Sequence, residues 1–243
     1  MLKEIGRVIQ IYRYPIKSMA GEPLEEIMLG WHGFEGDRRF AFRRQEISGG
    51  FPWLTASKLP QLLRYKPIYN YNNNSPKLPT HVLTSDGREL ELQGKPLQQE
   101  ISTTFGSPVE IMQLDQGIFD EAHVSIISNS TIDAIAQEAD MRLDVERFRP
   151  NILCETSSKL AFSEDAWVDK TIQIGEGETA AKVNIYMRDL RCVMINIDLV
   201  NCEIDARALK AVTRLNQTFA GVYATVIKTG KISVGDKLYM TIS

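Results

Sequence analysis

The chain has 243 residues, a net charge of −3 and a charged fraction of 24%. This length holds one large domain or two small ones, and the charge balance gives no basic field of the kind that binds nucleic acid. Three cysteines without a CxxC pair argue against a disulfide framework, a zinc ribbon or a cysteine-ligated iron–sulfur cluster. No apolar run approaches the ~18–20 residues that cross a bilayer. We therefore expect a cytoplasmic protein that binds neither membrane nor nucleic acid.

Short strands separated by turns dominate the first half of the chain. The β-branched run over residues 5–11 predicts a strand that Pro15 ends. Asp86-Gly87 predicts a tight turn between two strands of a hairpin, 81–84 and 88–92. Further expectations are strands at 27–29, 39–42, 53–55 and 109–114, an extended stretch at 64–71, a solvated loop at 71–76, and a short helix at 96–105 with Pro96 in its first turn.

The second half continues this pattern and adds two helices. The helix expected at 131–141 has Ser128, Asn129 or Ser130 as its N-cap, and the helix at 206–215 has Asp205. The remaining expectations are strands at 124–127, 151–154, 171–174, 181–186, 193–197, 222–227 and 237–242, and a turn-rich closing hairpin at 230–236.

Many short strands and three short helices predict a mainly β protein, built as a barrel or a sandwich. A break in the pattern at Asp115-Gln116-Gly117 places a domain boundary near residues 115–122.

Cys192 lies between an arginine-rich approach and an apolar run. Arg191 beside it favours the thiolate, which is a nucleophile, a redox group or a soft metal ligand. The alternative is a small apolar core residue, because free cysteine is among the most buried residue types. Neither Cys154 nor Cys202 has comparable surroundings.

Three other motifs carry groups that bind anions. The first motif is Lys17-Ser18, which follows the first strand and offers an ammonium group and a hydroxyl to a phosphate. The second is Asp37-Arg38, in which Arg38 could hold a phosphate while Asp37 fixes the geometry of Arg38. A polar loop and a surface ion pair are the corresponding structural alternatives.

The third motif is Arg147-Phe148-Arg149-Pro150-Asn151, where two arginines on an extended segment point the same way. Asn151 offers a donor and an acceptor to a heterocycle, and the alternative is an edge strand blunted by charge and proline. Together with Cys192, the motifs outline a site for a large, phosphorylated, metal-bearing ligand.

At these residues the sequence resembles the MOSC-domain family, named for the C-terminal domain of molybdenum cofactor sulfurase. It is also similar to the mitochondrial amidoxime-reducing components, in which a β-barrel domain precedes the MOSC domain. The resemblance covers nearly the whole chain. It implies a MOSC β-barrel with a few short helices at 119–243 and a β-barrel-like N-terminal domain at 1–118. The motifs that carry it are Tyr14–Ser18, Gly36–Arg38, Leu54–Ala56, Phe148–Asn151, Arg191-Cys192 and Gly230–Asp236.

The resemblance implies a molybdenum cofactor (molybdopterin) and a role for each matching position. Cys192 falls where the family's cysteine ligates molybdenum, and Asp198 falls near the approaching substrate. The implied cofactor-binding residues are Lys17, Ser18 and Arg38 at the phosphate, Arg149 and Asn151 at the pterin, and Tyr223 nearby.

The chain departs from the family at two places. Ile195-Asn196 stands where threonines are common, and Glu121-Ala122-His123 stands where reductase relatives have a Thr-Ser pair near the pterin. Glu121 would repel an anionic cofactor. His123 is either a proton donor or a structural residue.

The resemblance implies an oxidoreductase that reduces N-hydroxylated or N-oxide small molecules, with Asp198 or water supplying protons. Electrons must come from a flavoprotein, a ferredoxin or a cytochrome b5-like partner, because the chain lacks an iron–sulfur ligand set and a GxGxxG signature. One alternative is a sulfur carrier with a persulfide on Cys192, linked to pyridoxal-phosphate desulfurases. Another is a cofactor carrier without catalysis.

Overall fold

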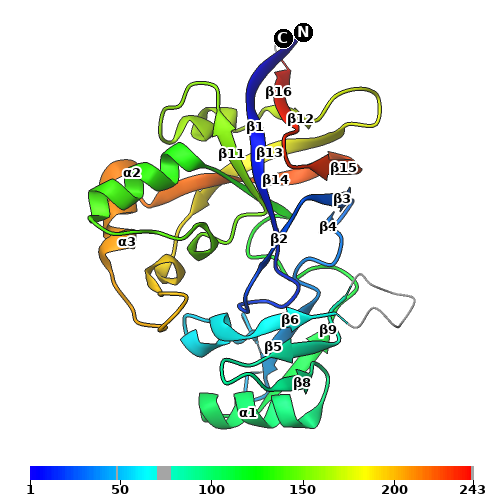
Figure 1. The fold of residues 1–243 in the computed structure, drawn as a ribbon, viewed down its shortest axis with the longest axis vertical. Helices are drawn as coiled ribbons and strands as arrows, with labels where there is room; N and C mark the ends of the chain where they lie inside the picture. The colour runs from blue at the N-terminus through cyan, green and yellow to red at the C-terminus, as the bar shows by residue number, and fades with distance from the viewer. Residues whose placement is uncertain (48, 70–77, 242–243) are drawn as a thin grey trace.

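The computed structural model describes residues 1–47, 49–69 and 78–241, and within them the fold is mainly β, as predicted. Seven strands pair side by side and close into a barrel, which forms the upper part of Figure 1. In order around the ring they are β11 (Ile152–Thr156), β10 (Val124–Ser128), β14 (Phe219–Lys228), β13 (Ala181–Leu190), β12 (Thr171–Ile174), β16 (Lys237–Thr241) and β1 (Leu2–Arg13).

The first strand of the chain is built into this barrel. β1 pairs with β11 on one side and with β16 on the other, so the two ends of the chain lie together at the top of Figure 1. β2 (Glu22–Leu24) extends the sheet beyond β1. Inside the barrel, aliphatic side chains such as Val8 and Val222 belong to one buried cluster, as expected for strands whose alternate residues face the core.

Two helices pack against each other beside the barrel, at the left of Figure 1. α2 (Asn129–Ala139) begins after Ser128, whose hydroxyl caps the helix. α3 (Arg207–Asn216) has Ala206 at the N-cap position. The prediction of Asp205 as the cap was one residue early, although its carboxylate still accepts the first helical N–H.

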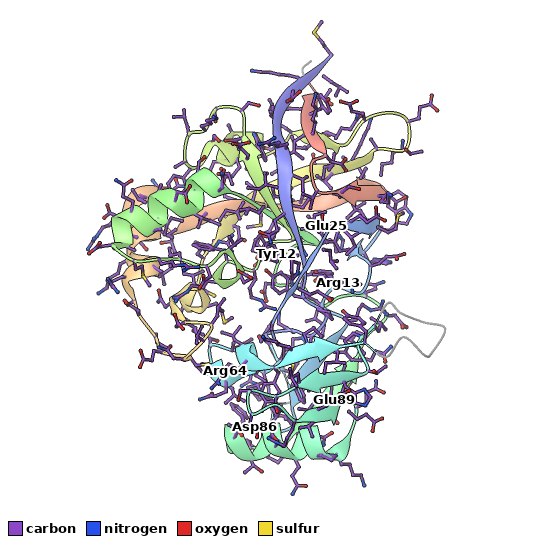
Figure 2. All side chains as sticks on the ribbon, viewed as in Figure 1. Tyr12, Arg13, Glu25, Arg64, Asp86 and Glu89 are labelled. Carbon is purple, nitrogen blue, oxygen red and sulfur yellow. The ribbon has the colours of Figure 1, made fainter. Side chains whose placement is uncertain are left out.

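Most of the remaining elements form the lower part of the molecule, which has its own apolar core. Arg13, at the end of β1, lies where the two parts meet and donates to Glu22 Oε1 at 2.8 Å (Figure 2). The lower elements are β5 (Phe40–Arg44) with β9 (Val109–Gln113), β6 (Lys66–Ile68) with β7 (His81–Leu83) and β8 (Glu89–Glu91), and α1 (Lys95–Phe105). A separate three-stranded sheet of β3 (Glu26–Gly30), β4 (Gly33–Phe34) and β15 (Gly230–Ser233) lies beside the barrel, and its buried residues belong to the same apolar cluster as the barrel interior.

Short 3-10 turns complete the described elements: η1 (Pro60–Arg64), η2 (Val145–Arg147), η3 (Ser163–Trp167) and η4 (Val193–Asn196). No helix in the described residues is long and apolar enough to span a membrane. The predicted strands at 5–11, 27–29, 39–42, 109–114, 124–127, 151–154, 171–174, 181–186 and 222–227, the 81–92 hairpin and all three helices are confirmed, with small shifts at their ends. The strand predicted at 237–242 is confirmed over residues 237–241, and residue 242 lies outside the described residues.

The strand predicted at 193–197 is wrong, because residues 193–196 form η4. Within this run, Ile197 makes an isolated bridge to Ile204. Ile195 is buried in the cluster that contains α3, and Asn196 Oδ1 accepts the N–H of Leu209 in that helix at 2.9 Å. Packing against α3 therefore overrides the β propensity of the run.

Three further predictions need correction. In the segment 53–55, Trp53 makes only an isolated bridge to Arg43. The closing hairpin at 230–236 does not form, because β15 leaves the barrel and pairs with β3. The stretch from Arg64 starts at the end of η1 rather than in an extended strand, although β6 follows. The loop predicted at 71–76 lies outside the described residues.

Candidate functional site

A cavity of about 490 Å³ gathers residues from both parts of the molecule. Its wall includes the 17–18 loop, the segment after β4, the turn that follows η2, and the end of β13. Six of the eight residues predicted from the sequence line it: Lys17, Ser18, Arg38, Arg149, Cys192 and Tyr223. Asn151 and Asp198 are not among its lining residues.

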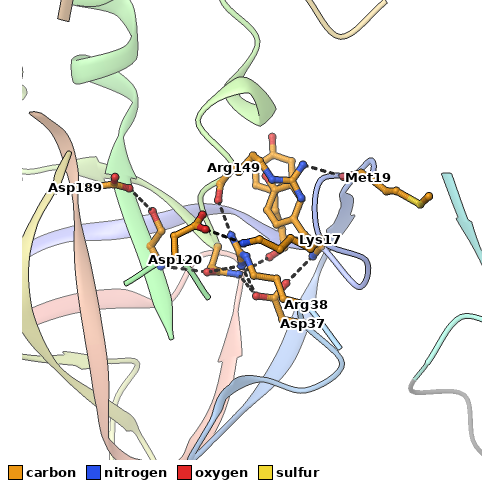
Figure 3. Close-up of polar contacts among 11 residues, drawn as sticks. Lys17, Met19, Asp37, Arg38, Asp120, Arg149 and Asp189 are labelled. Carbon is orange, nitrogen blue, oxygen red and sulfur yellow. Dashed lines mark hydrogen bonds and ion pairs between the residues drawn. The ribbon is translucent and has the colours of Figure 1, made fainter. Parts of the chain in front are cut away.

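Asp37 anchors the cationic side of the cavity from behind. Its buried carboxylate accepts the N–H of Tyr14 at 2.7 Å and the amide of Asn151 at 3.0 Å, and it forms an ion pair with Arg38 (Figure 3). Burial acts to lower the pKa of Arg38, but Asp37, together with Asp120, Tyr223 and Tyr14, outweighs it and the pKa is raised. The expected role of Asp37, fixing the geometry of Arg38, therefore matches the contacts.

Arg149, in the turn after η2, lines the same cavity as Arg38. Its guanidinium lies 4.3 Å from the centre of the Tyr14 ring, and Nη1 donates to the carbonyl of Met19 at 2.8 Å. Nη2 is buried and makes no hydrogen bond to the residues that the structure describes. Burial and the neighbouring Arg38 lower the pKa of Arg149 to about 10, which leaves it charged at neutral pH.

Three of these residues have left-handed backbone conformations that are uncommon outside glycine. The φ angle is 65° at Ser18, 49° at Arg38 and 51° at Arg149. Such conformations cost of order 1 kcal/mol each and persist only where the surroundings enforce them. Three of the ten described non-glycine residues with positive φ thus line this one cavity.

Lys17 is buried, and its Nζ donates to Asp120 Oδ1 at 2.7 Å (Figure 3). Burial lowers the pKa of Lys17, against the opposing effect of Asp120. Sequence reasoning missed Asp120, although it lies in the 115–122 segment taken as a boundary. Glu121 next to it also lines the cavity, so the acidic departure noted in the sequence does face the site.

Asn151 is almost fully buried, and its polar atoms are used within the protein. Its Oδ1 accepts the N–H of Ser125 at 3.1 Å, and its Nδ2 donates to Asp37 and to the carbonyl of Tyr12. Asn151 therefore ties the barrel to Asp37 rather than presenting a mixed edge to the cavity.

Cys192 is exposed at the start of η4 and lines the cavity. Arg191 does not stay beside its thiol, because the guanidinium is buried and donates to the carbonyls of Phe148 and Ala220, both at 2.7 Å. It also lies 2.9 Å from Asp189 Oδ2. The guanidinium of Arg191 therefore bonds within the fold, and Cys192 is exposed in the cavity wall.

Asp189 is a second acid that sequence reasoning missed. It is buried, lines the cavity and accepts a hydrogen bond from Ser125 Oγ at 3.2 Å. Burial raises the pKa of Asp189 to about 6, although Arg191 and Ser125 act in the opposite direction. The only signal in the sequence was an acid at the end of a predicted strand near Cys192.

Asp198 and Arg147 form an ion pair behind η4. Backbone N–H groups of Asn201 and Val200 hold the pKa of Asp198 below its usual range, and Arg147 adds to this. Asp198 is therefore ionised at neutral pH.

His123 does not line the cavity, and burial together with the nearby His32 lowers its pKa. Its ring lies against Phe119 and His32.

Comparisons with known proteins point in one direction. Residues 104–239 match the MOSC domain, and residues 5–123 match the MOSC N-terminal beta barrel domain. The mitochondrial amidoxime reducing component 2 of Homo sapiens is 24% identical over 98% of this chain and 84% of that protein. Its counterpart from Bos taurus is 23% identical over 99% and 85%.

The crystal structure of the YuaD protein from Bacillus subtilis has the same fold. It superposes with a TM-score of 0.54 at 12% identity and covers 99% of this chain and 98% of its own.

Proposed function

Because the chain belongs to the MOSC-domain family, which is associated with the molybdenum cofactor, we propose that this cavity binds that cofactor and supports reduction of N-hydroxylated or N-oxide small molecules. The observation that carries the proposal is the cavity itself, whose wall combines a cationic cluster with the exposed thiol of Cys192. The similarity to amidoxime reducing components suggests the reductase chemistry.

The residues present fit a phosphorylated, metal-bearing group. Lys17, Ser18 and Arg38 offer cationic and hydroxyl donors to a phosphate. We assign Arg149 to the phosphate as well, rather than to the pterin as the resemblance implied, because its Nη2 is a buried donor without a hydrogen-bond partner in the described structure. A thiolate at Cys192 is a suitable soft ligand for the metal. The carboxylate of Asp120 does not fit this role, because it already accepts the hydrogen bond of Lys17 and a phosphate would have to displace it.

The bound cofactor would supply two-electron exchange with the substrate. The chain's own residues would hold it by its phosphate, present the thiol of Cys192 and shape the space beside them. We assign Asn151 and Asp37 a positioning role, because they hold Arg38 without lining the cavity. Electrons would come from a separate flavoprotein, ferredoxin or cytochrome b5-like partner.

Reduction of an N–OH group to N–H and water also consumes two protons. Asp198, named from the resemblance, is a poor source because it is held ionised and does not line the cavity. Asp189 is buried in the cavity wall, and its raised pKa keeps part of it protonated near neutral pH. We therefore assign proton delivery to Asp189.

The first test is molybdenum content by elemental analysis, on wild type and Cys192→Ala produced in a host that makes the cofactor. We expect near-stoichiometric metal in the wild type and a large loss in the variant. A reduced viologen dye then replaces the unknown partner in an assay with benzamidoxime, where Cys192→Ser should be inactive. Full activity in Cys192→Ser would overturn the mechanism.

The exposure of Cys192 also favours a second candidate, a sulfur carrier in which this thiol holds a persulfide. Incubation with a cysteine desulfurase and its substrate, followed by intact mass analysis, separates the two. Sulfur added to the wild type but not to Cys192→Ala, in a protein that takes up no molybdenum, would favour the carrier. Metal uptake without added sulfur would favour the reductase.

A further inference from the structure

Arg147 and Arg149 diverge, whereas the sequence predicted that they point the same way. Arg147 closes η2, and Arg149 has a left-handed φ of 51°, so the segment is not extended. Arg149 reaches Met19 and Tyr14. Arg147 turns instead to Asp198, in the segment that follows η4. The cavity therefore has a second cationic pole, apart from the residues assigned to the cofactor's phosphate.

Arg147 is only partly used by the protein. Its side chain is 3% exposed, and Nη2 pairs with Asp198. Its Nε and Nη1 atoms are buried and make no hydrogen bond to any residue that the structure describes, although Arg147 lines the cavity. An unmet guanidinium donor in a buried position is costly, and an anionic ligand meets that need best.

Lys58 belongs to the same pole. It lines the cavity, and no ion pair of Lys58 is present among residues 1–47, 49–69 and 78–241. Its loop lies beside the segment that holds Asp198, because Ala56 and Ile197 are members of one small buried cluster. A cation with no ion-pair partner in the described part of the chain and a guanidinium with two unbonded nitrogens thus line the same cavity.

Part of the cavity wall is apolar. Met187, Leu190, Met194 and Ile195 line it on both sides of Cys192 in the sequence, with Asp189 and Arg191 between them, and Phe51 lines it near Lys17. A ligand that meets both the pole and this wall needs an apolar body with one anionic group.

We propose that Arg147 and Lys58 bind a carboxylate carried by the substrate, so that the protein prefers N-oxygenated compounds with an apolar body and a carboxylate. The N-oxygenated part of this statement rests on the proposed function. The carboxylate part does not, since it is testable in protein without cofactor. A planar guanidinium binds a carboxylate through two parallel hydrogen bonds.

The binding test uses the full chain without cofactor, in low-salt buffer. Titration calorimetry compares 4-amidinobenzoate, a carboxylated reduction product, with benzamidine, which lacks the carboxylate. We expect the carboxylated compound to bind about tenfold more tightly, a difference of about 1.4 kcal/mol. Arg147→Met and Lys58→Met should each reduce this preference. Equal binding of both compounds to the wild type would overturn the proposal.

Matched variants guard against trivial outcomes. Arg142→Met removes an arginine whose side chain is 92% exposed and which does not line the cavity, so it should leave the preference unchanged. Arg147→Lys keeps the charge and should retain part of it. Lys58 is exposed, so Lys58→Met tests the pole even if Arg147→Met fails to fold. An unchanged preference in a folded Arg147→Met protein would contradict the proposal.

Two further arms separate this inference from others. Saturating inorganic phosphate should not displace 4-amidinobenzoate. Full competition would show that both anions bind at Lys17, Arg38 and Arg149, and it would overturn the proposal. In the cofactor-loaded enzyme, kcat/KM for 4-carboxybenzamidoxime should exceed that for benzamidoxime. Binding preference without reduction of either compound would defeat the proposed function and leave the pole standing. Equal reduction of both compounds without a binding preference would support the proposed function and overturn the carboxylate site at Arg147 and Lys58.

Discussion

Lys17 Nζ donates a hydrogen bond to Asp120 Oδ1 at 2.7 Å, between residues 103 positions apart in the chain. Arg38 and Arg149 are close enough that they also lower the pKa of Asp120, although its partial burial acts to raise it. This carboxylate therefore lies in the field of the three cations to which we assign a phosphate. An incoming phosphate must compete with it.

Replacing Asp120 by Asn should strengthen binding of inorganic phosphate or pyrophosphate to the protein without cofactor. Removing one negative charge in partial contact with water is worth on the order of 1 kcal/mol, or about five- to tenfold in affinity. Calorimetry at low and moderate salt measures the change. Asp115→Asn is the matched control, because Asp115 is fully exposed. Weaker phosphate binding in Asp120→Asn would mean that Asp120 supports the site.

Replacing Asp37 by Ala should strongly destabilise the protein. Its carboxylate is buried and holds Arg38, Asn151 and the backbone of Tyr14, so the substitution leaves a buried cation and two donors unmet. Such losses cost about 3–5 kcal/mol. Urea denaturation measures the free energy of unfolding, and Asp115→Ala should change it by less than about 0.5 kcal/mol. A small loss in Asp37→Ala would contradict the anchoring role.

Asp189 should make stability fall as pH rises from about 4 to 7. Burial raises its folded pKa to about 6, above the ordinary aspartate value of 3.8, so the folded state binds more protons than the unfolded state in this window. The stability that this proton provides is complete below the unfolded pKa and is lost as pH rises through the folded pKa. The loss is on the order of 3 kcal/mol.

The measurement for Asp189 is unfolding free energy against pH, for wild type and for Asp189→Asn, which cannot titrate. The wild type should lose stability relative to the variant between pH 4 and 7. Parallel pH profiles would show that the pKa of Asp189 is not raised. In the loaded enzyme, the same substitution should remove a rate limb with an apparent pKa near 6.

Gly221→Ala should disturb the wall behind the cavity. An added Cβ would lie 2.6 Å from the carbonyl oxygen of Ile126 and 3.1 Å from Arg191 Nη2, at a φ of +78°. Gly87→Ala shares the backbone cost, since its φ is +85°, but its Cβ meets nothing within 4 Å. We expect Gly87→Ala to cost about 1 kcal/mol and Gly221→Ala clearly more. Equal losses of unfolding free energy in the two variants, measured by urea denaturation, would show that the residues around Gly221 move to accommodate the added Cβ.

The strands and helices were largely predictable because their signals are local. The β-branched run of β1, the Asp86-Gly87 turn of the hairpin and Pro96 at the start of α1 act over a few residues. The segment at 193–197 has equally strong β propensity, but it folds as η4 because Ile195 and Asn196 contact α3. Propensity fails there because a distant element decides the conformation.

The sequence by itself determined the types of group at the site. It identified Cys192 and the cations Lys17, Arg38 and Arg149 as candidates, because three anion-binding motifs together with one activated cysteine outline a ligand site although each motif alone has a structural alternative. The resemblance added Tyr223. All five line the cavity.

Only the tertiary structure decided what each neighbour does. Arg191 is turned into the barrel, Asn151 lies behind the wall, and Asp120 reaches Lys17 from the far side of the cavity. Arg147 separates from Arg149 because one left-handed residue redirects the chain. Burial and partner choice depend on contacts between residues 26 to 103 positions apart, which no local pattern encodes.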